Sequence, residues 1–190
     1  MRSLRDIMKK GRKLVMWTTQ GVAGGKIMEV DCCFTNENNW FRYRTGAIII
    51  EDSCILFAEN KSFNYLYTIG GGVHINETSE SCVKREVLEE TGIEYEIDHL
   101  SVICENFFKG HGRHDNKNCH CLELYFFMKS KGSKKLNENS INADGEKEFL
   151  RWIPLNEIKT ANIRPSFLKD KIYEIIESKN AFHIITDIDK

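Results

Sequence analysis

A strand, a glycine turn and a capped helix follow one another near the middle of the chain. The segment YLYTI at 65–69 has the β-branched and aromatic composition of a strand, and three glycines follow it at 70–72. Thr78 or Ser79 then offers the side-chain oxygen that a helix needs at its N-cap. Gly92 suits the other end, because glycine readily takes the left-handed conformation that closes many helices. The pattern predicts a helix between these caps, attached to the end of a strand in a sheet.

Three glutamates crowd the second half of this helix. Glu86, Glu89 and Glu90 stand at positions i, i+3 and i+4 and therefore share one face. Like charges at this spacing destabilise an isolated helix by about 0.2–0.5 kcal/mol per pair. A hard divalent cation removes that penalty, since Mg²⁺ and Mn²⁺ prefer oxygen ligands. Val83 and Val87 supply a separate apolar face. A solvated acidic face is the alternative that spacing alone leaves open.

The glycines ahead of the helix favour a binding site over a solvated face. Backbone without side chains lets a ligand approach closely, and a carbonyl of Gly70 or Gly71 turned inward adds a neutral metal ligand. Glu77 lies near the helix start, eight residues before Arg85. We expect these two side chains to form an ion pair that pins the loop to the helix, which is a structural role.

The stretch GGVHINETSESCVKREVLEETGI, residues 71–93, resembles the Nudix box over all 23 positions. The residues that the box specifies and that stand here are Gly71, Glu77, Arg85, Glu86, Glu89, Glu90 and Gly92. The common proline before the glycines is Ile69 here, and the common glycine before the first glutamate is Asn76. Both differences lie outside the acidic set. The resemblance to the surrounding domain is looser and extends over about residues 28–180.

The resemblance implies an α/β (α+β) fold, with an α/β/α sandwich around a mixed sheet. It implies a Mg²⁺- or Mn²⁺-dependent pyrophosphohydrolase acting on a nucleoside diphosphate linked to another group, of the nucleotide house-cleaning type. By position, Glu86, Glu89 and Glu90 are the expected metal ligands, with backbone oxygen of Gly70 or Gly71. The resemblance also marks further residues as catalytic or structural. These are Glu86 as the group that assists deprotonation of the attacking water, Glu89 and Arg85 beside it, and Glu77, Arg85 and Gly92 as the frame.

A further acidic group often comes from a loop beyond the box in this family. Glu146 and Glu148, shortly before Trp152, are the candidates, and Glu123 on the preceding strand is a third. For each of them a surface or sheet-edge glutamate is an equally good interpretation.

Substrate recognition is expected from the strands and loops around the box. Alternation places Trp40, Arg42 and Arg44 on one side of a strand, where a ring can stack on a base and an arginine can bind phosphate. Aromatic residues on a strand are more often core. The polar loop 109–118 carries a cluster of basic side chains that includes Arg113 and that can receive phosphates. A solvated loop is the alternative interpretation. The family's marker residues for ADP-ribose and dinucleoside-polyphosphate substrates are not evident in FFKG, residues 107–110. Our substrate-binding candidates are Arg42, Arg44, Phe107 and Arg113.

The rest of the chain predicts a mixed sheet with helices on its faces. Strands are expected at 40–52, 54–60, 94–108 (bent), 119–130 and 149–155, and a terminal amphipathic helix at 166–179 with Phe167, Ile172, Ile175 and Ile176 as its apolar stripe. We assign residues 28–190 to the domain. Residues 1–27 are expected to be a flexible basic extension, or to precede the true start at Met28. A mitochondrial targeting peptide is a weaker alternative.

Charge and cysteine content limit the other functions. Residues 1–27 carry a net charge of +6 and the remainder −7, which argues against a body that coats nucleic acid. Seven cysteines, an odd number at irregular positions, indicate free thiols in the cytoplasm. No apolar run is long enough to span a bilayer. A small-molecule partner is expected, no membrane, and a homodimer is allowed. A Nudix-fold binding or regulatory module without turnover, and an RNA 5′-end pyrophosphohydrolase, are the alternatives.

Overall fold

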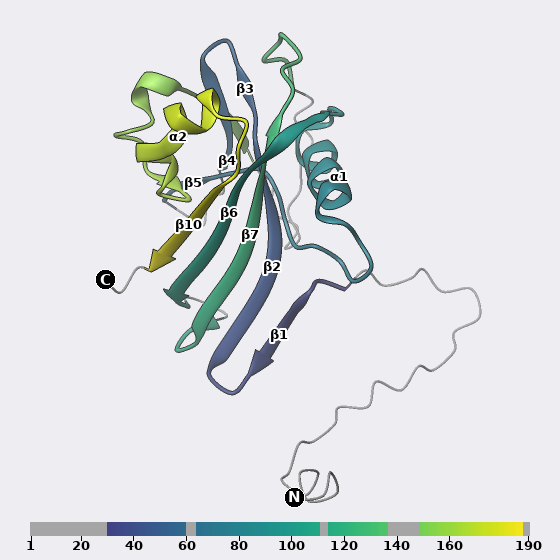
Figure 1. Cartoon of the computed structure of the whole chain (residues 1–190), viewed down its shortest axis with the longest axis vertical. Helices are drawn as coiled ribbons and strands as arrows, with labels where there is room; N and C mark the ends of the chain where they lie inside the picture. The colour runs from purple at the N-terminus through teal and green to yellow at the C-terminus, as the bar shows by residue number, and fades with distance from the viewer. Residues whose placement is uncertain (1–29, 60–63, 111–113, 137–148, 188–190) are drawn as a thin grey trace, which may run out of the picture.

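The computed structural model describes residues 30–59, 64–110, 114–136 and 149–187. Two helices, α1 (Ser79–Thr91) and α2 (Leu168–Glu177), flank a body made mostly of strands (Figure 1). The strands are β1 (Cys33–Asn36), β2 (Asn39–Ile48), β3 (Ile50–Glu51), β4 (Cys54–Glu59), β5 (Leu66–Tyr67), β6 (Ile97–Lys109), β7 (Asn118–Met128), β8 (Phe149–Pro154), β9 (Ile163–Arg164) and β10 (Phe182–Asp187), with a 3₁₀ turn at Leu155–Glu157. The predicted class, mixed sheets with helices on their faces, is confirmed.

The larger sheet has the strand order β1-β2-β7-β6-β10. β2 and β7 run parallel, with Arg44 opposite Glu123, whereas β6 and β7 are antiparallel. β10 is an edge strand, parallel to β6, and Figure 1 shows it at the end of the fan that these strands form. The sequence patterns did not predict β1, β9 or β10. They did predict a bent β6, and the register of β6 against β7 shifts between Ile97 and Val102.

The smaller sheet is built on a hairpin between β3 and β4, with the order β3-β4-β5-β9 and β8 also paired to β4. Asp52 and Ser53 form its turn with φ of 46° and 58°, the positive values typical of tight hairpin connections. The turn lies where the sequence predicts it. β8 runs antiparallel to β4, with Trp152 opposite Leu56, so the predicted strand at 149–155 has its partner.

Two apolar cores explain why the run GAIII is continuous rather than alternating. Ala47 and Ile49 pack on the α1 side, in a core that includes Val83 and Val87. Ile48 points the other way, into the core under α2. The α2 core also contains Leu168, Ile172 and Ile175. Successive side chains of a strand point to opposite faces, and here both faces are covered.

The terminal helix is shorter than the predicted range 166–179. Of its predicted stripe, Phe167, Ile172 and Ile175 are buried, and Ile176 is only partly buried against the same core. Leu168, which the stripe omitted, is fully buried. Within the described part of the chain, no helix is long and apolar enough to cross a membrane.

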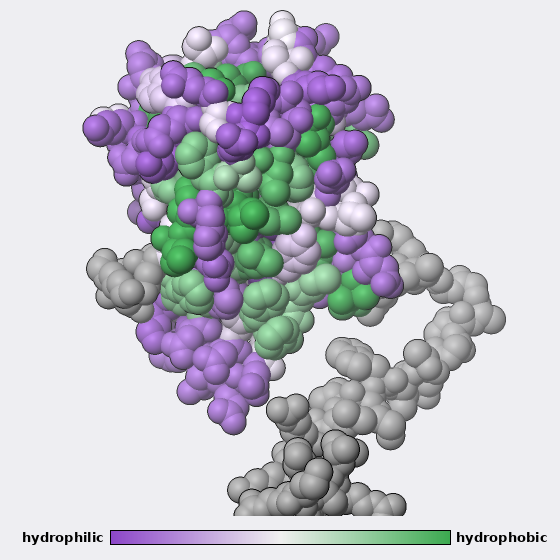
Figure 2. Space-filling view, in the orientation of Figure 1, coloured by the Kyte–Doolittle hydropathy of each residue, from purple (hydrophilic) through white to green (hydrophobic). Residues whose placement is uncertain are grey.

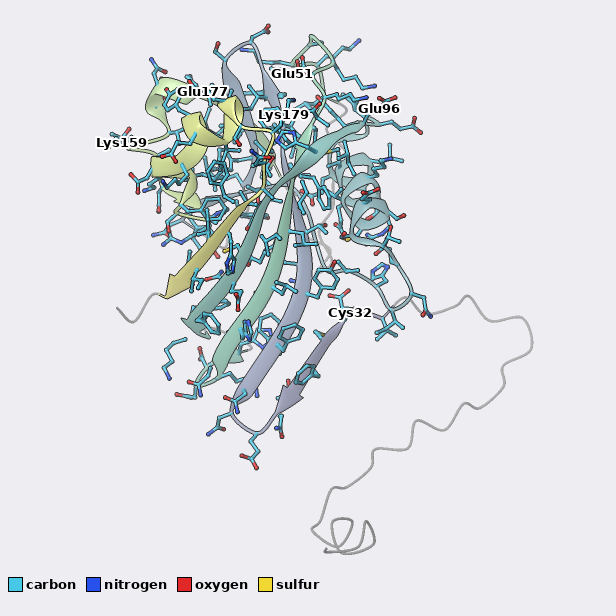
Figure 3. All side chains as sticks on the ribbon, in the orientation of Figure 1. Cys32, Glu51, Glu96, Lys159, Glu177 and Lys179 are labelled. Carbon is cyan, nitrogen blue, oxygen red and sulfur yellow. The ribbon has the colours of Figure 1, made fainter. Side chains whose placement is uncertain are left out.

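All seven cysteines are free thiols, as the sequence predicts. Cys33 is exposed and Cys32 half-buried; Figure 3 shows Cys32 beside the start of β1, away from Glu51 and Glu96. Burial raises the pKa of Cys104 and Cys121 to about 12. The segment Cys-His-Cys at residues 119–121 is part of β7, and Cys119 and Cys121 are buried in the sheet.

Candidate active site

The caps of α1 fix the positions of the three glutamates. Thr78 accepts a hydrogen bond from Ser81 N at 3.1 Å through its side-chain oxygen, which satisfies one of the free N–H groups of the first turn. At the other end Gly92 has φ 68°, and its N–H donates to Leu88 O at 2.8 Å. Both caps are those that the sequence predicts. The two caps therefore set where the helix begins and ends, and the three glutamates share one face of it.

The glycine segment runs alongside β2 and passes very close to α1. Thr45 N donates to Gly71 O at 2.9 Å, which ties the segment to the strand. Gly70 has φ 136°, and a Cβ there would lie 2.3 Å from Thr45 O. At Gly71 a Cβ would lie 2.2 Å from an oxygen of Glu86. Glycine is needed at 70 for its backbone conformation and at 71 for the close approach of the helix carboxylate.

Arg85 is the centre of an ionic cluster. It donates to Glu77 through Nε at 2.9 Å and Nη2 at 3.0 Å, the expected ion pair in bidentate form. Nη1 donates to Glu86 at 2.7 Å and to Glu89 at 3.2 Å, and Nη2 to Gly72 O at 3.3 Å. The hydrogen bonds from Arg85 lower the pKa of Glu77 to about 2. We call Glu77, Arg85, Glu86, Glu89 and Glu90 the box cluster.

The three glutamates of the box face differ in their surroundings. Glu86 is half-buried, and this burial raises its pKa against the opposing effect of Arg85. The Glu89 side chain is 58% exposed. Glu90 accepts from Gly70 N at 2.9 Å. The three glutamates therefore lie where α1 meets the glycine segment.

The donor set of this face suits a hard divalent metal. Among the described residues, no three acidic, histidine or cysteine side chains already converge on one point. Glu86 and Glu89 nevertheless both bind Nη1 of Arg85, so two carboxylates turn toward one cation. Gly70 O accepts from Arg44 at 3.3 Å and keeps a second lone pair, whereas Gly71 O accepts from Thr45 N and, at 4.0 Å, from the Cys82 thiol. Carboxylate and carbonyl oxygens are the ligands that Mg²⁺ and Mn²⁺ prefer.

The structure divides the substrate-binding candidates between two faces of the larger sheet. Arg42 and Arg44 share one face of β2; Arg42 donates to Asp31 at 3.2 Å and Arg44 to Gly70 O. Trp40 lies on the same face by alternation and stacks on the His114 ring, with centroids 4.1 Å apart. The site residue positions 113, 146 and 148 (Arg113, Glu146 and Glu148) lie outside the described residues.

Phe107 is on the opposite face, so the structure does not bring it together with the arginines. Its ring stacks on His120 at 4.3 Å, and Phe41 meets the other side of that histidine at 5.3 Å. Figure 2 shows hydrophobic side chains gathered over the middle of the larger sheet. The side chain that shares the arginine face is Phe108, opposite Cys119. A displacement of one residue along a strand changes the face.

A second polar cluster, which the sequence did not predict, lies inside the larger sheet. Glu123 is 4% exposed and accepts from the Tyr125 hydroxyl and from Asn106 Nδ2, the latter at 3.2 Å. Glu123 is thus not the accessible acidic group that its position beyond the box suggested. Arg44 lies opposite it on β2. We call Arg44, Asn106, Glu123 and Tyr125 the sheet cluster. Asp31, which binds Arg42, was likewise missed.

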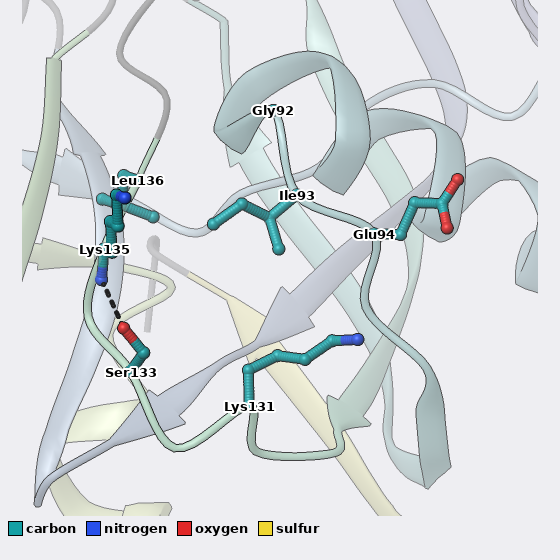
Figure 4. Close-up of a pocket in the computed structure, with 7 residues that line it drawn as sticks. All are labelled: Gly92, Ile93, Glu94, Lys131, Ser133, Lys135 and Leu136. Carbon is teal, nitrogen blue, oxygen red and sulfur yellow. Dashed lines mark hydrogen bonds between the residues drawn. The ribbon is translucent and has the colours of Figure 1, made fainter.

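A separate hollow of about 550 Å³ lies at the C-terminal end of α1. Figure 4 shows it between the Gly92–Glu94 segment and the loop that carries Lys131 and Lys135. None of the box glutamates lines it. We therefore place the candidate active site at the glycine segment and not in this hollow.

Comparison with known proteins identifies the family of the chain. A family model described as the NUDIX domain matches residues 40–172. The chain belongs to the Nudix family. Its members are hydrolases of pyrophosphate bonds and generally use a divalent metal.

Individual relatives are similar in part of the sequence or in fold. A MutT-like protein from Streptomyces ambofaciens is 39% identical over 66 residues, which are 34% of this chain and 42% of that protein. The matched segment is thus less than half of that relative. The crystal structure of a NUDIX-family hydrolase from Clostridium perfringens has a TM-score of 0.54 at 17% identity, covering 72% of this chain and 96% of the other. An ADP-ribose pyrophosphatase from Streptococcus suis has a TM-score of 0.52 at 14% identity, covering 76% and 98%. These structures share the Nudix fold.

Proposed function

We propose that this Nudix chain is a Mg²⁺- or Mn²⁺-dependent pyrophosphohydrolase that cleaves a nucleoside diphosphate linked to another group. The observation that supports it is the box cluster, in which Glu86 and Glu89 turn toward one cation and Glu90 binds the glycine segment. A protein of similar fold is named an ADP-ribose pyrophosphatase, which describes this class of substrate. The family membership supports the reaction, and the cluster supports the place where it occurs.

In the proposed site Glu86, Glu89 and Glu90 hold the metal, together with a carbonyl oxygen of Gly70 or Gly71. A divalent metal bound there would neutralise diphosphate charge and orient a water for displacement at phosphorus. Glu86 is the proposed proton acceptor, because it is half-buried and its carboxylate lies against Gly71. Arg85 keeps Glu86 and Glu89 turned inward while Glu77 anchors Arg85.

The arginine face of β2 is the proposed place for the substrate. Arg42 and Arg44 offer guanidinium groups to phosphate, and their Nε atoms are buried without a hydrogen-bond partner. Trp40 and His114 already form an aromatic stack on that face, onto which a base can add. We leave Phe107 out of the proposed set because it lies on the other face.

Several predictions from the sequence remain proposals. Arg113, Glu146 and Glu148 stay candidates for substrate binding and for an additional acidic group. We propose that residues 28–190 form the catalytic domain and that residues 1–27 are an extension. A homodimer and a cytoplasmic location also remain predictions.

A hydrolysis screen tests the proposed function. The full chain is assayed with ADP-ribose, nucleotide sugars, nucleoside triphosphates, dinucleoside polyphosphates and 5′-triphosphate RNA, in Mg²⁺, in Mn²⁺ and in excess EDTA. We expect turnover of a nucleoside-diphosphate substrate that EDTA abolishes. Glu89→Gln should lower kcat/KM by about 10²-fold or more, the scale of losing a group that stabilises developing charge. Glu80→Gln is the matched control, because Glu80 is an exposed glutamate in the first turn of the same helix.

Two results would contradict the proposal. Full activity of Glu89→Gln, or turnover in EDTA, would remove the metal role of the box face. Tight binding of a nucleotide with no turnover would show a binding module instead.

A further inference from the structure

The sheet cluster lies between the C-terminal edge strand and the glycine segment, and hydrogen bonds together with the attraction of two opposite charges relate the two. Thr186 on β10 donates to Asn106 Oδ1 at 2.6 Å, and Asn106 donates to Glu123 at 3.2 Å. Arg44 stands beside Glu123 on the next strand and donates to Gly70 O at 3.3 Å. Four strands therefore contribute to this arrangement: hydrogen bonds join Thr186, Asn106 and Glu123, the charge of Glu123 attracts Arg44, and Arg44 binds the backbone of the candidate active site.

The buried charge of Glu123 is balanced on every side. Its two oxygens accept from Tyr125 and from Asn106. Burial and the neighbouring carboxylate raise the pKa of Tyr125 well above its usual value, so its hydroxyl remains a donor. Burial lowers the pKa of Arg44, but the neighbouring acidic groups, Glu123 foremost, together more than offset this, and the guanidinium stays charged. A carboxylate with 4% exposure is not available to a substrate.

The peptide group of Gly70 is held from two directions. Its carbonyl accepts from Arg44, and its N–H donates to Glu90 at 2.9 Å. Gly70 has φ 136°, a backbone conformation that residues other than glycine rarely adopt. These two hydrogen bonds therefore add to the backbone bonds with β2 in fixing where the glycine segment lies against α1.

The absence of a side chain at Gly46 leaves the space that the Tyr125 ring occupies in this arrangement. A Cβ at that position would lie 2.4 Å from the ring of Tyr125. The ring is 2% exposed and packs edge-on against Phe167, with centroids 5.3 Å apart. Tyr125 thus has one place available, from which its hydroxyl meets Glu123.

We propose that Glu123 is a positioning residue: it fixes the Arg44 guanidinium so that Arg44 holds the Gly70 carbonyl, which sets the glycine segment against the box glutamates. Tyr125 and Asn106 orient Glu123, and Thr186 orients Asn106. The inference rests on the proposed function for its kinetic consequence. Its structural consequence does not depend on turnover.

The first readout is amide hydrogen exchange at residues 69–73, measured by NMR on the metal-free full chain. In Glu123→Gln the charge is lost while the shape is kept, so Arg44 is freed from Glu123. We expect exchange at Gly70 and Gly71 to become about tenfold faster, the scale of one lost hydrogen bond to a charged group. Tyr125→Phe should shift the same amides in the same direction by about threefold. The control is Glu105→Gln, an outward carboxylate on β6 that pairs with His183.

The second readout is steady-state kinetics on the best substrate of the hydrolysis screen. A positioning role predicts that Glu123→Gln lowers kcat about tenfold while KM changes by less than about twofold. Thermal unfolding confirms that each variant is folded, and Tyr125→Phe carries the test if Glu123→Gln does not fold.

Unchanged exchange at Gly70 and Gly71 in a folded variant would overturn the inference. So would an equal effect of Glu105→Gln, or a rise in KM with kcat unaltered, because that pattern would show that Glu123 acts only through the substrate contact proposed for Arg44 and not through the glycine segment. If wild type hydrolyses nothing, the proposed function fails, while faster exchange in Glu123→Gln would still support the positioning role of Glu123.

Discussion

The box cluster and the sheet cluster are both built from arginine and glutamate, but they come together in different ways. All members of the box cluster lie between residues 77 and 90, and Arg85 donates four hydrogen bonds within it, two to Glu77 and one each to Glu86 and Glu89. The sheet cluster combines residues from β2, β6 and β7, with Thr186 of β10 bonded to it. The first is partly exposed, and the carboxylate of the second is buried.

This difference separates the box cluster, which we propose takes part in the reaction, from the sheet cluster, which we propose holds the glycine segment in place. Glu89 is exposed, so its contact with Arg85 can be exchanged for a contact with another cation at small cost, since surface ion pairs contribute about 0–1 kcal/mol. A buried, fully bonded carboxylate cannot move without leaving charges unpaired, which costs about 3–5 kcal/mol. The box cluster should therefore respond to substitution in activity, and the sheet cluster in stability as well. A matched pair of glycine substitutions sharpens this contrast.

Gly71→Ala should have the largest effect on activity. The new Cβ would lie 2.2 Å from the end of the Glu86 side chain, which is flexible and can swing away. Such a shift displaces the proposed proton acceptor by an ångström or more, and a misplacement of that size costs about 10²-fold in rate. We expect kcat to fall by about that factor while the unfolding free energy changes by less than about 1 kcal/mol. Kinetics and urea unfolding measure both; a loss of stability with normal kcat would contradict the assignment.

Gly46→Ala should show the opposite pattern. Its Cβ would lie 2.4 Å from a buried tyrosine ring that has no free direction. Overpacking of this kind costs about 1–3 kcal/mol, which corresponds to roughly 2–12 °C in Tm for a chain of this size. Calorimetry of Gly46→Ala beside Gly71→Ala measures the contrast. Equal Tm values for the two variants would break it.

The two clusters also differ in how far the sequence predicts them. The box residues are close together in the sequence: helix periodicity puts Glu86, Glu89 and Glu90 on one face, and Glu77, just before the helix, lies within reach of Arg85. The sheet cluster depends on β2 pairing in parallel with β7, a long-range choice that no local pattern specifies.

The features that the sequence left open have the same origin. Phe107 was a substrate-binding candidate together with the arginines, and the register of β6 shows that Phe108, not Phe107, lies on their face. Glu123 is an acidic residue in the region where a catalytic acid is expected. Only its neighbours on the adjacent strands show that it is buried. The edge strand β10 has short alternation after a helix and gains its meaning from its partner β6.

The acid limb of stability should belong to the box cluster. The pKa of Glu77 is lowered to about 2 in the folded chain by the hydrogen bonds from Arg85, against about 4.3 when unfolded. A lowered folded-state pKa adds stability above the unfolded value, and that stability is lost as pH falls toward 2. After allowance for solvent screening we expect a loss of about 1–2 kcal/mol between pH 5 and pH 2. Urea unfolding across this range should be flatter in Glu77→Gln. An identical slope in the variant would show that Glu77 is not held by Arg85 in solution.

The alkaline limb should carry a smaller contribution from the sheet cluster. Burial and Glu123 raise the pKa of Tyr125 well above its usual value, so the folded chain keeps a proton that the unfolded chain releases near pH 10. A raised folded-state pKa gives stability that is complete below the unfolded value and is lost as pH rises through it. Above pH 10 the wild type should therefore lose up to about 1.4 kcal/mol more per pH unit than Tyr125→Phe. Unfolding free energies of both proteins between pH 8 and pH 11 measure the difference. Parallel curves would mean that Tyr125 titrates normally, and the sheet cluster would then be as open to solvent as the box cluster.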